Sequence, residues 1–243
     1  MPRFFVNEDA VCGTDVSIVG SDAHHIARAL RMAVGEEITV CTDGGRELLC
    51  RLSRIRDGGV QAEILSESAC RSEMPLFVTL YMAYPKGDKL ETVVQKAVEL
   101  GASRIVPFVS ERCIRRPKPE KLSSERERLA RIAQEAAKQS GRGILPEVLM
   151  PLSFDGMLER ATEDPIALFC YEGEGTEPIR AQLSGERPAR LSVIVGSEGG
   201  FSVEEAEAAR RAGCKLTGLG PRILRCETAP LYALSAVSVL LEL

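Results

Sequence analysis

Short apolar stretches separated by turn residues mark the first part of the chain. Strands are expected at residues 4–6, 16–19, 37–41, 47–55 and 60–65. Asp43-Gly44-Gly45 and Asp57-Gly58-Gly59 lie between the last three of these stretches and are hairpin-turn signals. Many short strands joined by tight turns are typical of a small β-barrel.

One helix is expected within this strand-rich part, at residues 22–32. At α-helical spacing, His24, Arg28 and Arg31 share one face of it. Because basic side chains supply most of the affinity for a nucleic-acid backbone, this face is a candidate RNA contact. The alternative is an exposed amphipathic helix with a half-buried histidine. Arg3, beside two phenylalanines, is a further candidate.

The rest of the chain alternates buried strands with helices. The polar segment 66–75 is interpreted as a linker with a boundary near residue 73, which gives domains 1–73 and 74–243. Strands are expected at 76–83, 104–109, 166–171, 191–195 and 215–219. Helices are expected at 88–100, at 124–140, between Ser202 and Gly213, and at the C-terminus with Pro230 in the first turn. This alternation predicts an α/β domain with a mainly parallel sheet.

Local signals define how these helices begin. Asp88, Ser124 and Ser202 are each followed three residues later by a glutamate, which predicts a capping box at each start. The final helix is apolar nearly all round, which is typical of a core helix or a subunit interface.

Charge is distributed unevenly along the 243 residues. The formal net charge of −4 argues against a partner with many negative charges. However, residues 104–142 carry 11 basic and 5 acidic groups, a net charge of +6, between a segment of −4 and one of −6. This basic block is either an RNA-binding footprint or a solvated helix face. The block contributes four candidate RNA contacts: Arg112, Arg115, Arg116 and Arg142.

The eight cysteines occur singly and form no C-x-x-C pair, and the two histidines are adjacent, so no zinc site is expected. Reduced thiols in the cytoplasm are the simplest interpretation, since residues 1–13 lack the apolar region of a signal peptide. The longest apolar run, 229–243, is too short to span a bilayer, so no membrane association is expected.

Two glycine-bearing stretches near the C-terminus carry the most specific pattern. Residues 196–202 read G-S-E-G-G-F-S and residues 219–229 read L-G-P-R-I-L-R-C-E-T-A. Each follows an apolar run and precedes a helical segment. The first fits neither the G-x-G-x-x-G nor the P-loop pattern. Because glycine lets a ligand approach the main chain closely, the pair predicts a pocket lined by backbone groups.

These stretches resemble two cofactor-loop motifs of the RsmE-type 16S rRNA uracil-N3 methyltransferases, within the SPOUT superfamily. The family patterns are G-(P/S)-E-G-G-(F/L)-(S/T) and L-G-x-R-I-L-R-x-E-T-A, with Cys226 at the variable position before Glu227. Two further matches are K-x-D-K-x-E from Lys86 and Q-S-G-R at 139–142. The resemblance therefore extends over most of the chain.

The resemblance implies a SPOUT-type parallel sheet with a C-terminal trefoil knot, preceded by a small PUA-like RNA-binding β-barrel. It also implies S-adenosylmethionine as cofactor, 16S rRNA in the 30S subunit as substrate, and a homodimer. Lys86 and Lys89 would lie near the RNA. The cofactor would contact Tyr171, Gly196, Glu198, Gly199, Gly200, Leu219, Gly220, Ile223, Leu224, Thr228 and Ala229.

Methylation at N3 of a uridine requires the loss of the proton on that nitrogen. The second domain contains no histidine, which leaves a carboxylate, water or a group from elsewhere as proton acceptor. Glu198 and Glu227 are the carboxylates of the two motifs, and Glu227 could equally order an arginine. Arg222 or Arg225 could stabilise negative charge on the uracil oxygens.

Other functions remain open at this stage. A related SPOUT enzyme could act on a different RNA or atom, and a non-enzymatic RNA-binding protein could keep a vestigial pocket. An oxidoreductase that binds a dinucleotide is disfavoured because its glycine fingerprint is missing.

Overall fold

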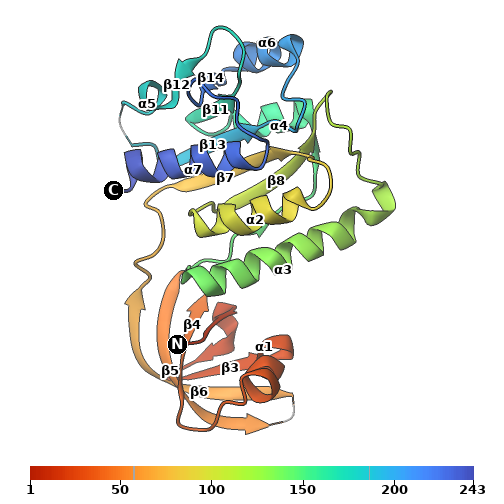
Figure 1. The fold of residues 1–243 in the computed structure, drawn as a ribbon. Helices are drawn as coiled ribbons and strands as arrows, with labels where there is room; N and C mark the ends of the chain where they lie inside the picture. The colour runs from red at the N-terminus through yellow and green to blue at the C-terminus, as the bar shows by residue number, and fades with distance from the viewer. Residues whose placement is uncertain (57, 186) are drawn as a thin grey trace. The chain divides into compact units, whose positions relative to one another are not determined.

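Six strands near the N-terminus form one sheet in the computed structural model (Figure 1), which describes residues 1–56, 58–185 and 187–243. The strand order is β1-β4-β5-β6-β3-β2, antiparallel except where β1 meets β4. The bounds are β1 Arg3–Val6, β2 Val11–Cys12, β3 Asp15–Val19, β4 Glu37–Thr42, β5 Arg46–Arg56 and β6 Gly59–Ala69. The five predicted strands are confirmed, and Asp57 of the second turn signal lies outside the described residues.

The described chain divides into two units. The first contains Met1–Glu73 together with Ala137–Leu145, and the second contains Met74–Ala136 together with Pro146–Leu243. The segment Ala137–Leu145 therefore belongs with the strands of the first unit. A single boundary near residue 73 does not predict this grouping.

The core of the first unit lies on one face of its sheet. Val16 and Ile18 alternate with exposed neighbours on β3 and are fully buried, as are Phe4 and Ile38. β6 runs to Ala69, so the linker predicted from residue 66 begins too early. The polar residues there are exposed and belong to the part of β6 that pairs with β5. The side chain of Arg46 on β5 also donates a hydrogen bond to the carboxylate of Glu67.

The predicted helix at 22–32 is wrong in form. The structure has a five-residue α-helix, α1 Gly20–His24, followed by a π-helical turn, η2 His25–Ala29. The Leu30 amide donates to the His25 carbonyl at 2.9 Å, and Arg31 has a left-handed φ of 52°. The wider turn keeps Ile26 fully buried. Because the α-helix ends at His24, α-helical spacing does not place His24, Arg28 and Arg31 on one face.

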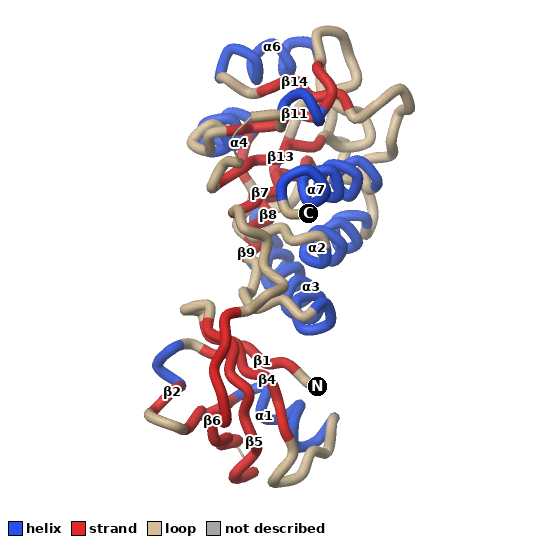
Figure 2. Tube along the Cα trace, turned by 90° about the vertical axis from the view of Figure 1, so that its left-hand side faces the viewer, coloured by secondary structure: helices blue, strands red, loops and turns tan. Residues whose placement is uncertain are grey.

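The sheet of the second unit is parallel throughout its described pairs, as predicted. Figure 2 shows its strands between helices on both sides. The strand order is β10-β8-β7-β13-β11-β14-β12, and β9 also pairs with β8. The bounds are β7 Phe77–Ala83, β8 Arg104–Val109, β9 Glu147–Val148, β10 Leu152–Ser153, β11 Ile166–Cys170, β12 Glu177–Pro178, β13 Arg190–Val195 and β14 Lys215–Gly218. The central strands β7, β11 and β13 are mostly apolar and buried because helices cover both faces of such a sheet.

Helices connect these strands. Their bounds are α2 Lys89–Glu99, α3 Leu122–Ser140, α4 Phe154–Ala161, α5 Ile179–Gln182, α6 Val203–Ala212 and α7 Thr228–Leu241, with short 3₁₀ turns η1 Glu8–Ala10 and η3 Pro119–Lys121. One face of α7 is core, with Leu234 and Val237 buried, whereas Tyr232 and Val239 on the same helix are exposed. Among the helices of the described residues, none is both long and apolar enough to cross a bilayer.

Only one of the three predicted capping boxes is present. Ser202 and Glu205 exchange both hydrogen bonds at the start of α6. Asp88 makes no side-chain cap on α2. Ser124 lies inside α3, because the turn that begins at Pro119 continues directly into that helix. The Ser124 hydroxyl donates instead to the Lys121 carbonyl at 3.0 Å.

Candidate functional site

The carboxyl ends of three adjacent parallel strands open onto one cavity of about 440 Å³ in the second unit. Cys170, Val195 and Gly218 end β11, β13 and β14, and all three line it. The loops that follow these strands supply most of the remaining wall. Ligands of open α/β sheets bind at this edge, outside the carboxyl ends of the strands.

Most of the predicted cofactor residues line this cavity. Those that do are Tyr171, Gly196, Glu198, Gly200, Leu219, Gly220, Ile223, Leu224 and Ala229. Gly199 and Thr228 are not among its lining residues. Gly199 packs against Arg112, which donates a hydrogen bond to the Gly199 carbonyl at 3.1 Å. Thr228 is exposed at the first position of α7.

The glycine loops need glycine for two separate reasons. Gly200 and Gly220 have φ values of 62° and 106°, which residues with a Cβ rarely adopt. Gly196 has ordinary φ, but a Cβ there would lie 3.1 Å from the backbone of Gly200. The loop therefore folds tightly on itself and turns main-chain groups toward the cavity.

Several lining residues escaped the sequence-based prediction. The three strand-end residues could have been found from the rule that parallel strands present their carboxyl ends to a ligand. Phe201 belongs to the first motif, and the centre of its ring lies 4.1 Å from that of the buried Phe169, with the two rings tilted by 35°. The further lining residues are Glu172, Thr176, Ser197 and Cys226. Ser197 and Cys226 lie within the two motifs and Glu172 follows the predicted Tyr171, whereas Thr176 has no sequence signal.

Lys89 bridges the two motif loops. Its ammonium nitrogen lies 3.0 Å from Glu198 Oε1 and 3.2 Å from Glu227 Oε2. It also lies 3.7 Å from Cys226 Sγ, and the lysine lines the cavity. The sequence placed Lys89 near the RNA, whereas the structure engages it with both motif carboxylates.

Glu198 is held by donors from the start of α2. The Lys86 backbone amide donates to its two oxygens at 3.0 and 3.3 Å, while the side chain of Lys86 is exposed. Partial burial opposes ionisation of Glu198, but the hydrogen bonds from Lys89 and Lys86 outweigh it and lower its pKa. The same contact raises the pKa of Lys89. The cluster therefore remains charged at neutral pH.

Arg222 and Arg225 line the cavity from the second motif loop and are both exposed. The intervening Ile223 is 82% exposed. The cavity thus combines main-chain groups, a carboxylate–ammonium cluster and two guanidinium groups near its opening. This set can bind a nucleoside and stabilise negative charge on a second reactant.

The basic loop before α3 is tied to this site. Arg115 donates to the Gly87 carbonyl at 3.1 Å and lies 5.5 Å from the centre of the Tyr84 ring. Arg116 is exposed and donates to the carbonyl of Glu111 at 3.3 Å. The Glu111 amide in turn donates to the buried carboxylate of Glu205 at 2.8 Å.

Two of the RNA contacts predicted for the first unit, Arg3 and Arg142, lie in ion pairs of that unit. Arg142 is only 2% exposed, and its guanidinium lies 2.7 Å from the carboxylate of Glu73. It is therefore not available to RNA, and the predicted RNA contact at this residue is wrong. Arg3 is largely buried and donates to Glu47 at 2.7 Å and to the Arg142 carbonyl at 3.3 Å. The three remaining candidates of this unit are exposed: His24, Arg28 and Arg31.

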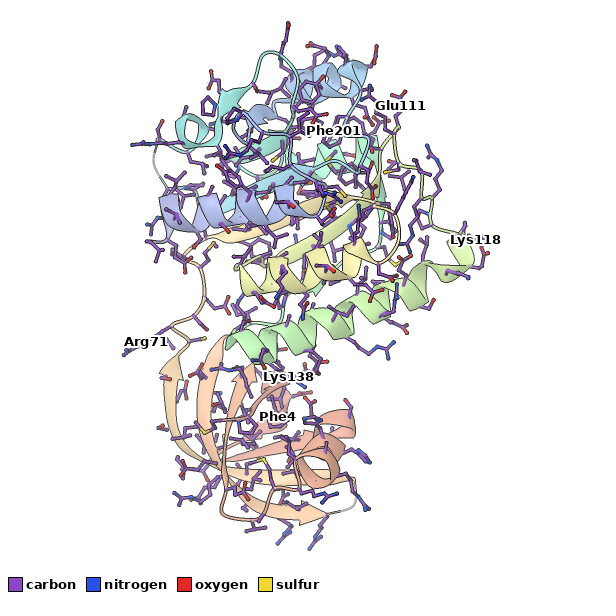
Figure 3. The ribbon with its side chains drawn as sticks, in the orientation of Figure 1. Phe4, Arg71, Glu111, Lys118, Lys138 and Phe201 are labelled. Carbon is purple, nitrogen blue, oxygen red and sulfur yellow. The ribbon has the colours of Figure 1, made fainter. Side chains whose placement is uncertain are left out.

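Other residues of the basic block also meet carboxylates. Those paired with acidic residues outside 104–142 are Arg104 with Glu147, Arg128 with Glu91, Lys138 with Asp22 and Arg142 with Glu73. Lys138 also lies 5.5 Å from the centre of the Phe4 ring (Figure 3). The local excess of positive charge in the sequence is therefore partly neutralised in the fold.

Removal of the Glu73 charge is expected to destabilise the first unit. The carboxylate of Glu73 compensates the buried Arg142 and accepts amide hydrogen bonds from Gly143 at 2.7 Å and Ile144 at 3.1 Å. Loss of one partner of a buried ion pair costs about 3–5 kcal/mol. Urea unfolding of a Glu73→Gln variant measures this loss. Glu67→Gln, which removes an exposed partner of Arg46, is the control and should change little; equal losses would contradict the structural role of Arg142.

Family comparison assigns both parts of the chain to one class of protein. A family described as "RNA methyltransferase domain" matches residues 72–238, and one described as "RNA methyltransferase PUA domain" matches residues 19–65. The parallel sheet, the cavity at its carboxyl edge and the N-terminal sheet are thus those of an RNA methyltransferase.

Individual relatives narrow this class. The chain is 36% identical to the Ribosomal RNA small subunit methyltransferase E of Bacillus subtilis, over 93% of this chain and 91% of the relative. It is 34% identical to the protein of that name from Synechocystis, over 99% and 78%. The chain belongs to the ribosomal RNA small subunit methyltransferase E family, which confirms the resemblance seen in its motifs.

A solved structure supports the same assignment. The family member from Neisseria gonorrhoeae, described as bound to S-adenosyl methionine, superposes with a TM-score of 0.86 at 33% identity. The alignment covers 99% of this chain and 98% of that one. The mixed α/β fold with its additional PUA domain is therefore shared along the whole length.

Proposed function

We propose that this protein transfers a methyl group from S-adenosylmethionine to N3 of a uridine in 16S rRNA of the small ribosomal subunit. The observation that carries the proposal is the cavity where the loops after β11, β13 and β14 meet. Two of these loops carry the glycine motifs of the family. The structural relative from Neisseria gonorrhoeae, described as bound to S-adenosyl methionine, supports the choice of cofactor.

The residues of the cavity fit such a cofactor. Its volume of about 440 Å³ lies within the usual range for small-molecule sites. Leu219 and Leu224 offer apolar surface for a base, and Gly200 and Gly220 line the cavity with main-chain atoms alone. When bound, S-adenosylmethionine supplies an electrophilic methyl group on a positively charged sulfur. The neighbouring carboxylates Glu172 and Glu198 suit a cationic ligand.

The arginines of the second motif loop are assigned to the RNA base. Loss of the N3 proton leaves negative charge shared with the uracil oxygens, and Arg222 or Arg225 would stabilise it electrostatically. Because base pairing occupies N3, the target uridine must be unpaired or extruded. The exposed His24, Arg28, Arg31, Lys86 and Arg116 remain proposed RNA contacts.

The finer organisation follows from the family resemblance. We assign residues 1–73 to a PUA-like RNA-binding barrel and 74–243 to a SPOUT domain with a trefoil knot that gathers the three loops. A homodimer would cover the exposed apolar side chains of α7, which include Tyr232, Val239 and Leu240. The described cysteines are free thiols, which fits a reducing cytoplasm.

Product analysis tests the proposal. Incubation of small subunits that lack the modification with isotope-labelled cofactor, followed by digestion to nucleosides and mass spectrometry, is expected to yield 3-methyluridine. Arg225→Ala should lower the rate about 100-fold or more, while Arg211→Ala on the exposed face of α6 should leave it unchanged. A methylated ribose or guanine would indicate a related SPOUT enzyme. Absence of both product and cofactor binding would indicate a non-enzymatic RNA-binding protein.

A further inference from the structure

Glu227 receives two side-chain donors on the same oxygen. The Cys226 thiol donates to Glu227 Oε2 at 3.2 Å, and the Lys89 ammonium lies 3.2 Å from that atom. The two donors come from opposite ends of the second unit's sequence, since Lys89 begins α2 and Cys226 immediately precedes Glu227. The orientation of the carboxylate is therefore fixed by two separate segments of the chain.

The ammonium of Lys89 makes three contacts within this cluster. A lysine has three N–H donors and no acceptor. Those of Lys89 are directed at Glu198 Oε1 at 3.0 Å, Glu227 at 3.2 Å and Cys226 Sγ at 3.7 Å. All three contacts lie within the cluster, so we infer that Lys89 acts on the substrate through the residues that it holds.

We propose that Lys89 and Cys226 are positioning residues that keep Glu227 ionised and in one orientation. Glu227 then serves as a fixed hydrogen-bond acceptor, and it is not the group that takes the proton from the uridine nitrogen. This inference rests on the proposed methyl transfer. The sequence left Glu227 either as the proton acceptor or as a residue that orders an arginine, and this inference excludes the first of these roles. It also gives a function to Cys226, which stands at the variable position of the motif.

The charge states agree with this geometry. The hydrogen bond from Cys226 is the largest cause that lowers the pKa of Glu227, and the contact with Lys89 lowers it further. Burial, together with the hydrogen bond to Glu227, raises the pKa of the Cys226 thiol to about 12. The thiol therefore keeps its proton and remains a donor at neutral pH. A carboxylate with a lowered pKa is a weak base.

Alkylation of Cys226 tests the cluster without any cofactor or RNA. Peptide mapping by mass spectrometry follows the reaction of iodoacetamide with Cys226 in the full-length protein. The thiolate is the reactive form, and its amount changes tenfold for each unit of thiol pKa. Because Glu227 raises and Lys89 lowers the pKa of this thiol, Glu227→Gln should speed the reaction about threefold or more, and Lys89→Met should slow it by a similar factor.

The opposite signs are the signature of the proposed cluster. Lys96→Met, on the same helix and paired with Glu99, is the matched control and should leave the alkylation rate unchanged. Equal acceleration in Lys89→Met and Glu227→Gln would mean that both changes merely loosen the packing. This result would overturn the assignment of Lys89 and Cys226 as positioning residues.

Steady-state kinetics with small subunits test the role of Glu227. Cys226→Ala should lower kcat about tenfold, and Cys226→Ser, which restores a donor, should recover most of that loss. Glu227→Gln should lower kcat only about tenfold without a change in the shape of the pH profile. A larger loss, of the 10²–10⁴-fold that a general base supplies, together with loss of the acid limb, would identify Glu227 as the proton acceptor. Failure of the unmodified protein to methylate would reject the proposed function and leave the alkylation result valid.

Discussion

A Gly220→Val variant is expected to fold and to lose affinity for S-adenosylmethionine by about 100-fold or more, equivalent to about 2.8 kcal/mol of binding free energy. Gly220 lines the cavity with a φ of 106°, and among the described residues beyond its two chain neighbours no atom lies within 4 Å of the place where a Cβ would stand. The valine side chain would therefore occupy the space proposed for the cofactor. Calorimetric titration of the purified protein measures the loss.

Gly213 provides a closely matched control for this variant. It has a φ of 101°, its Cβ position is equally open, and it ends α6 away from the lining of the cavity. A β-branched residue at either position is strained by about 1–3 kcal/mol. Gly213→Val should therefore lose similar stability while keeping its affinity. Equal affinities in both variants would show that the cofactor does not approach Gly220.

Phe201→Ala is expected to cost about 3–5 kcal/mol of unfolding free energy, the largest effect on stability predicted for the site. Phe201 is 3% exposed, and its ring lies 4.1 Å from that of Phe169 and 6.2 Å from that of Phe108 (Figure 3). These rings anchor the first motif loop in the core. Urea unfolding measures the loss, and the loosened loop should also weaken cofactor binding.

The neighbouring Val203 distinguishes this effect from a general sensitivity of the loop. It is 61% exposed at the first position of α6, two residues after Phe201. Val203→Ala should change the unfolding free energy by less than about 0.5 kcal/mol. A similar small loss for Phe201→Ala would mean that the aromatic cluster does not support the loop.

The sequence predicted the elements whose signals are local. β11 and β13 are long apolar runs, and α6 begins at a Ser202–Glu205 capping box and ends at Gly213 with positive φ. Each of these features is decided by neighbouring residues. The two glycine motifs likewise located the cavity, because the loops that contain them directly follow the strand ends that form it.

Features that depend on distant partners could not be predicted in this way. Arg142 looked like a surface cation until Glu73, 69 residues away, was seen to neutralise it. Lys89 meets Glu198 from 109 residues away, so its sequence neighbours say nothing of its role. The π-helical turn η2 also depends on residues distant in the sequence. Burial of Ile26 against the sheet overrides the regular helix that the spacing predicted.

The central claim is that glycine-rich main-chain loops at the carboxyl edge of the parallel sheet hold the methyl donor. A crystal structure of this protein grown with S-adenosylmethionine tests it most directly. The account predicts electron density for the cofactor in the 440 Å³ cavity, within hydrogen-bond distance of main-chain atoms in residues 196–200 and 219–224. Cofactor density at another place, with this cavity empty, would contradict it.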